Sequence, residues 1–353
     1  MQSLTSIFLP LGLRRWRRRF TLQARGIRKC ALILLCMCVV GLMSYNHGTM
    51  YRQTPRGGEE TFVYTKTHTQ DGSICAYVAG KDRHVLENNL DRQTVYSGMV
   101  ATSDIVPGGT QGLALMDMFS IRTDGKVEAK QTALDIPVRA LVMPLQSPKV
   151  AGMLVKALDR FVMPVLESSG GNIWKQRSDV LHTTIFHLSG HENPVSVGQE
   201  GITKEIDAVS SLLKDAHSKQ EATCSMHVFL ERILVTQSGH IVACWQLMDG
   251  LEVEVAQFRK ALKRIFPQAR QTIAHDGIIH MTLARIVVFP KQKKDLLMNK
   301  LDEMNKELCG LQVSFSQVWY VLEHDRLALA LNGRHEIRET FGLPCIEVQN
   351  ESH

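Results

Sequence analysis

Two strand-like segments decide the fold: DVLHTTIFHL at residues 179–188 and GIIHMTLARIVVF at residues 277–289. Both are short, apolar and rich in β-branched residues, which is typical of buried strands. Each contains a His-x-Thr tripeptide, at 182–184 and at 280–282. Side chains alternate along a strand, so each histidine should share one face with its threonine while the other face packs into a core.

The surrounding chain alternates between strand and helix patterns from about residue 134 onward. Because several strands are joined by short turns, such as Gln237-Ser238-Gly239, we expect an α+β fold. The expected strands are 138–145, 226–236, 240–247, 311–323 and 327–331, and the expected helices are 150–171, 199–218, 251–266 and 290–309.

Residues 61–133 are harder to interpret. FVYTKT at 62–67 and MFSIRTDGKVEAK at 118–130 resemble strands, the latter with an Asp124-Gly125 turn. PGGTQG at 107–112 indicates a loop. We therefore expect 46–133 to be a linker followed by an N-terminal extension.

The N-terminus is strongly basic. Residues 1–58 hold ten Lys/Arg and no Asp or Glu, which leaves 31 basic and 35 acidic side chains in the rest of the 353-residue chain. The slightly acidic remainder argues against a duplex DNA-binding face, which needs clustered cations. No partner protein is predicted.

An uncharged run, CALILLCMCVVGLMSY at 30–45, follows the basic tail 1–29. Sixteen residues span roughly 24 Å as a helix, enough for a thin bilayer. With positive charge kept in the cytosol, this predicts a type II signal anchor, with the rest in the lumen of the endoplasmic reticulum or Golgi. A cleaved signal peptide and a mitochondrial or chloroplast transit peptide are the alternatives.

Eight cysteines give no metal signature. Five of them lie beyond the apolar run, and no Cys-x-x-Cys occurs among these five. Free buried thiols are expected, with one or two disulfides if the domain is lumenal. We predict no metal and no cofactor.

The tripeptide His-x-Thr gains weight from its context. A third copy, at 47–49, lies beside the apolar run with no obvious role. The two internal copies lie mid-strand, 98 residues apart, in comparable runs of strands and helices. This suggests two related lobes that face each other.

LHTTIFHLSGH at 181–191 and IIHMTLARI at 278–286 resemble the paired signatures of the 2H phosphoesterase superfamily. The resemblance covers 134–346 and leaves 347–353 as a tail. It implies a bilobal α+β fold with a cleft between pseudo-symmetric lobes. It also implies that His182 and His280 are catalytic and that Thr184 and Thr282 bind phosphate oxygens.

The residue types fit this chemistry. Two imidazoles can act as general base and general acid near neutrality, and hydroxyl donors can stabilise the charge on a phosphoryl group. Substrates would be nucleoside 2′,3′-cyclic phosphates, related cyclic or terminal phosphodiesters, or an RNA end. The symmetry leaves open which histidine is the base.

Other residues near the tripeptides are expected to be structural. Strict alternation would put His187 on the face opposite His182, which argues against a metal site, and Arg285 on the face opposite His280. Trp319 and Tyr320 could edge a base-stacking pocket, although core packing is the usual role of such aromatics.

Two other functions remain open from the sequence. One is a catalytically inactive module that binds a nucleotide or a protein in the cleft. The other is a lumenal glycosyltransferase, which often has a short tail and a single anchor. No Asp-x-Asp occurs in the chain, and neither a Gly-x4-Gly-Lys phosphate loop nor a His-Glu-x2-His is found.

Overall fold

The structure is a computed structural model. It describes residues 67–68, 75–76, 83–109, 113–219, 226–248, 254–271, 273 and 275–343. The predicted basic tail, the signal anchor 30–45, most of the strand 62–67 and the tail 347–353 lie outside the described residues. Within the described part, no helix is long and apolar enough to cross a membrane.

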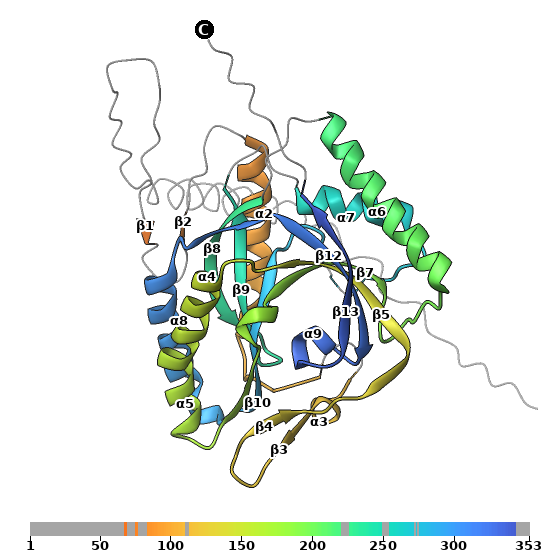
Figure 1. Ribbon diagram of the computed structural model, residues 1–353. Coiled ribbons are helices and arrows are strands. Elements are labelled where there is room, and N and C mark those ends of the chain that lie inside the picture. Colours follow the sequence, from red (N-terminus) through yellow and green to blue (C-terminus); the bar gives the residue numbers. More distant parts are fainter. Residues whose placement is uncertain are drawn as a thin grey trace, which may run out of the picture. The chain divides into compact units, whose positions relative to one another are not determined.

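Two antiparallel sheets form the framework, which confirms the mixed α and β class (Figure 1). The larger sheet has the order β11 (Gln312–Phe315), β8 (Met226–Val235), β9 (His240–Leu247), β10 (His280–Val288) and β6 (Asn172–Lys175). The smaller sheet has the order β13 (His335–Gly342), β12 (Gln317–Asp325), β5 (Ala133–Pro144) and β7 (His182–Ser189). One His-x-Thr strand therefore belongs to each sheet.

Helices of five to 21 residues back both sheets with their buried faces. These are α4 (Pro148–Ala157), α5 (Met163–Glu167), α6 (Gln199–Lys219), α7 (Val255–Ile265) and α8 (Lys294–Leu308). Ser147 caps α4 by accepting a hydrogen bond from the Val150 amide. The predicted helix 150–171 is interrupted by a π-helical turn, Leu158–Val162, and Gly170 follows it with a positive φ of 73°.

The N-terminal extension contains a helix that the sequence pattern did not predict, α2 (Arg83–Met99). Its buried positions are Asn89, Arg92 and Tyr96, which share one face at helical spacing. Because two of these residues are polar, the apolar periodicity that indicates a surface helix is absent.

A short helix and a hairpin follow in the extension: α3 (Leu115–Met118), β3 (Phe119–Ile121) and β4 (Val127–Ala129). The turn is at Asp124-Gly125, as predicted, and Gly125 has a positive φ of 82°. The other two described strands of the extension, β1 (Thr67–His68) and β2 (Cys75–Ala76), pair with each other.

Two expectations near the C-terminus were wrong, and one strand was missed. The predicted strand 327–331 is a helical turn, α9 (Ala328–Leu331), because Leu327 and Leu331 pack into one cluster and Leu329 into another. The predicted strand 311–323 is divided at Ser316 into β11 and β12, which belong to different sheets. The strand β13 was not predicted at all, because only Phe341 of its side chains is buried.

Candidate active site

The two His-x-Thr tripeptides have the same burial pattern. His182, Thr184, His280 and Thr282 are half-buried, whereas the residues between and directly after each pair are fully buried. Each threonine lies opposite a valine of the neighbouring strand, Val142 in β5 and Val242 in β9. The predicted alternation therefore holds through both tripeptides.

A β-bulge follows each tripeptide at the same position. Both Ile185 and Phe186 turn into the core opposite Leu141, and both Leu283 and Ala284 do so opposite Ile241. A bulge adds one residue to one strand only, so the alternation reverses beyond it. The faces that strict alternation assigned to His187 and Arg285 are therefore wrong.

His187 and Arg285 are the residues affected, each five positions after its motif histidine. His187 pairs with Ala140, which shares a face with Val142 and thus with Thr184. Arg285 pairs with His240, which shares a face with Val242 and thus with Thr282. Both side chains lie on the same face as the His-x-Thr pair of their own strand, contrary to the expectation.

The helical turn α9 contacts the histidine-bearing faces of both sheets. Leu329 packs against Ala140, Val142 and Val321 of the smaller sheet. Leu327 and Leu331 pack in a cluster with Val287 and Trp174 of the larger sheet, and Trp174 donates a hydrogen bond to the Ala330 carbonyl. α9 lies between the two sheets (Figure 1), and β7 and β10 also contact each other.

A single guanidinium connects the two motif segments. Arg259 of α7 is 2% exposed, and it donates to the carbonyls of Thr184 and Ile185 in β7 at 2.8 Å each. It also donates to the carbonyls of Asp276 and Ile278, directly before β10, at 2.6 and 2.7 Å. Sequence reasoning missed Arg259, because its partners are backbone atoms distant in the chain.

The hydrogen bonds of His182 identify its tautomer. Its Nδ1 lies 2.8 Å from the Val180 carbonyl, which can only accept, so Nδ1 carries the hydrogen. The Gln176 amide nitrogen donates to the same carbonyl at 2.9 Å and lies 3.3 Å from Nδ1, which is the longer of the two Nδ1 contacts. In the neutral ring, Nε2 is therefore left with its lone pair. Burial lowers the pKa of His182, while the bond to Val180 opposes that effect.

His280 has a different environment. Its Nδ1 is buried and has no hydrogen-bond partner among the described residues. Burial, together with the charges of Arg259 and His182, lowers the pKa of His280 to about 4. Since charge on one imidazole affects the other, the two motif histidines interact electrostatically.

Neither His187 nor His191 forms a metal site with the pair. The described residues contain no group of three or more His, Cys, Asp or Glu side chains arranged to hold a metal ion. Burial lowers the pKa of both imidazoles to about 4. The His191 Nε2 accepts a hydrogen bond from the Leu327 amide, which anchors the start of α9.

The aromatic pair of β12 is divided between two environments. Tyr320 is fully buried and bonds to the Glu205 carboxylate, so it is structural. Trp319 is half-buried and lies opposite Val142, on the face that carries Thr184. Its position leaves it near the proposed site, in the cluster with Leu329.

The extension helix α2 packs beside His280. Its Tyr96 hydroxyl bonds to the backbone of Ile279 and Trp245, and Arg92 donates to the Gly277 carbonyl. Tyr96 also packs against Cys244, which lies opposite His280. The extension thus fixes the start of β10, an assignment that the sequence left open.

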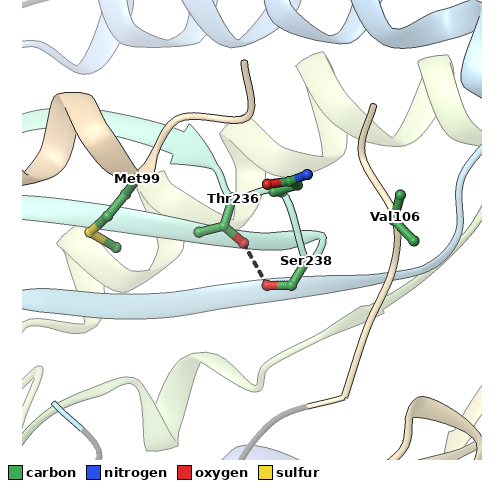
Figure 2. Close-up of a pocket in the computed structure, with 5 residues that line it drawn as sticks. Met99, Val106, Thr236 and Ser238 are labelled. Atoms are coloured by element: carbon green, nitrogen blue, oxygen red, sulfur yellow. Dashed lines mark hydrogen bonds between the residues drawn. The ribbon is translucent and has the colours of Figure 1, made fainter. Parts of the chain in front are cut away.

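A hollow of about 460 Å³ lies at the turn between β8 and β9 (Figure 2). It is lined by Met99, Val106, Thr236, Gln237 and Ser238, and the Thr236 and Ser238 hydroxyls bond to each other at 3.1 Å. None of the four predicted site residues lines it.

Cys244 is a free buried thiol, whereas Cys309 forms a disulfide.

Comparison with solved structures finds distant likenesses. The conserved protein ATU0111 of Agrobacterium tumefaciens is 18% identical with a TM-score of 0.39, over 58% of this chain and 85% of its own. E. coli LigT is 13% identical with a TM-score of 0.35, over 60% and 99%. Kluyveromyces marxianus Usb1, solved with uridine monophosphate, is 12% identical with a TM-score of 0.33, over 59% and 97%.

No protein-family model matches the sequence, and a comparison with curated proteins found no match. With TM-scores below 0.5, the structural likenesses are distant. The functional proposal below therefore depends on the residues of this chain.

Proposed function

We propose that the chain is a metal-independent phosphodiesterase of the 2H type. It would open a nucleoside 2′,3′-cyclic phosphate, or a related terminal phosphodiester, between His182 and His280. The observation that carries the proposal is the matched pair of strands. Both have a half-buried His and Thr, both have a bulge directly after the threonine, and Arg259 bonds to both motif segments.

The two hydrogen-bond environments favour different roles for the histidines. His182 is held by Val180 with its Nε2 lone pair available, so it is the better general base. His280 has a pKa of about 4 and no hydrogen bond at Nδ1, so its protonated form is the stronger acid. We therefore propose His182 as the base and His280 as the acid, a choice that the sequence left open.

The reaction then balances in a single displacement. His182 Nε2 takes a proton from water, whose oxygen attacks phosphorus, and the bond from phosphorus to one ribose oxygen breaks. Protonated His280 gives its proton to that oxygen. Thr184 and Thr282 donate to the non-bridging oxygens and stabilise the charge that develops there.

The direct test is hydrolysis by the full-length chain. Nucleoside 2′,3′-cyclic phosphates are incubated with it in excess EDTA, and products are followed by phosphorus NMR. We expect a monophosphate product that is lost in both His182→Ala and His280→Ala. His324→Ala, which changes an exposed histidine, is the control. A folded wild-type chain that leaves all such substrates intact would rule the hydrolase out.

A binding module without turnover is the second candidate. The observation in its favour is that burial lowers the pKa of both histidines, so the free protein holds both rings neutral at pH 7. Tight binding of a nucleoside monophosphate without hydrolysis of the cyclic compound would select this alternative.

We also propose that residues 30–45 anchor the chain in a membrane, with the described part in the lumen. Support comes from the sequence alone: an uncharged run follows a basic tail. A mitochondrial or chloroplast location is the alternative.

A further inference from the structure

Five arginines are buried among the described residues, and four of them bond to carboxylates or carbonyls. A buried guanidinium needs carboxylates or carbonyls because its desolvation is strongly unfavourable. Arg92 bonds to Gly277, Asn89 and Glu254, Arg139 to Glu205 and Val195, Arg232 to Glu231, and Arg259 to four carbonyls.

Arg285 is the exception. It is 8% exposed, and its one hydrogen-bond contact is from Nη1 to the Met118 sulfur at 3.9 Å, a weak acceptor. Burial lowers the pKa of Arg285 to about 10, and no carboxylate opposes this effect. The side chain is therefore a largely buried cation with no oxygen acceptor among the described residues.

The bulge at Leu283 brings this cation to the face of the proposed site. Arg285 lies opposite His240 in β9 and Trp174 in β6. Its partner His240 is two residues from Val242, the partner of Thr282, so at about 3.3 Å per residue the Arg285 backbone lies roughly 7 Å along the strand from Thr282. His240 lies opposite Arg285, and the charges of Arg285 and His280 both lower the pKa of His240.

We propose that Arg285 binds a second anionic group of the substrate, about one nucleoside away from the phosphate held between His182 and His280. The proposal rests on the proposed function and narrows its substrate class. The preferred substrate carries a 5′-phosphate in addition to the 2′,3′-cyclic phosphate, and the guanidinium supplies the bidentate contact that such a group favours.

Binding of product-like nucleotides to the full chain tests this without requiring turnover. Isothermal titration compares adenosine 2′-monophosphate with adenosine 2′,5′-bisphosphate. We expect the wild-type chain to bind the bisphosphate about ten-fold more tightly, the size of one charge-assisted contact. Arg285→Met should remove this preference and leave the affinity for the monophosphate unchanged. Arg160→Met, which changes an exposed arginine, should keep the preference.

The outcomes separate this subsite from the hydrolase. Binding with the expected preference but no hydrolysis refutes the hydrolase and supports the subsite. Equal wild-type affinity for the two nucleotides, or binding of neither, overturns the subsite even if hydrolysis occurs. An equal loss of both affinities in Arg285→Met also overturns it. If that variant does not fold, Arg285→Lys should retain part of the preference, and its complete loss there counts against the proposal.

Discussion

Replacement of Arg259 tests the link between the two motif strands. Arg259→Met removes four hydrogen bonds, two to β7 and two to the segment before β10. Bonds to a charged group contribute about 1.5–3 kcal/mol each, but bonds from one side chain are not additive. Because four buried carbonyls would be left without a hydrogen-bond donor, we expect the free energy of unfolding to decrease by about 3–5 kcal/mol.

The conservative variant separates geometry from charge. A lysine keeps the positive charge but has three donors on one nitrogen and cannot span four carbonyls, so Arg259→Lys should cost about 2 kcal/mol. The pKa of His280 should rise in Arg259→Met, because a nearby positive charge is removed, and should stay low in Arg259→Lys.

Urea unfolding and NMR titration of the His280 ring measure the two effects. Arg264→Met, which changes an exposed residue of the same helix, should stay within about 0.5 kcal/mol of wild type. If Arg259→Met has the wild-type free energy of unfolding and the wild-type His280 titration, Arg259 does not link the two motif segments as described. If Arg259→Met cannot be purified as a folded protein, Arg259→Lys is measured instead, and a wild-type free energy of unfolding for Arg259→Lys would refute the role of Arg259.

Four further outcomes are expected. His182→Ala and His280→Ala should each lower kcat by about 10²-fold or more with little loss of stability, measured by phosphorus NMR and urea unfolding. The pKa of His280 is lowered to about 4 and that of His240 to about 3 in the folded chain, so below pH 6.5 the unfolded chain binds more protons than the folded chain. The free energy of unfolding should therefore decrease as the pH is lowered from 6.5 to 4. Because His280 must be protonated to act as the general acid and its pKa is about 4, kcat/KM should increase as pH falls from 8 towards 6. A kcat/KM that increases as pH rises over this range would contradict the acid role of His280. If residues 30–45 span a membrane, alkaline carbonate should leave the full chain in the membrane pellet but release a chain that begins at residue 46.

Local patterns predicted much of the framework. Strands such as β8, β9 and β10 and the helix α6 were placed within a few residues, because their periodicity is set by burial on one face. The half-burial of His182 with Thr184 followed from the same alternation. Whether the four motif residues act together in catalysis stays a prediction.

Other features depend on pairing between distant segments. The bulges at Ile185 and Leu283 depend on how β5 and β9 align with β7 and β10, and nothing in the local sequence marks them. The contact face of α2 is partly polar because Arg92 finds acceptors in another part of the chain. Such contacts between distant segments cannot be predicted from the local sequence and are identified only from the structure.

The paired bulges give each strand one residue more than its neighbour without changing the partners of the residues that follow. Deleting Ile185 or Leu283 would still leave His187 opposite Ala140 and Arg285 opposite His240, because the residue removed is the extra one. Such a deletion would remove one buried side chain and straighten the strand. Members of any lineage carrying this architecture should therefore lose or gain a residue at the bulge more readily than within the regularly paired part of either strand.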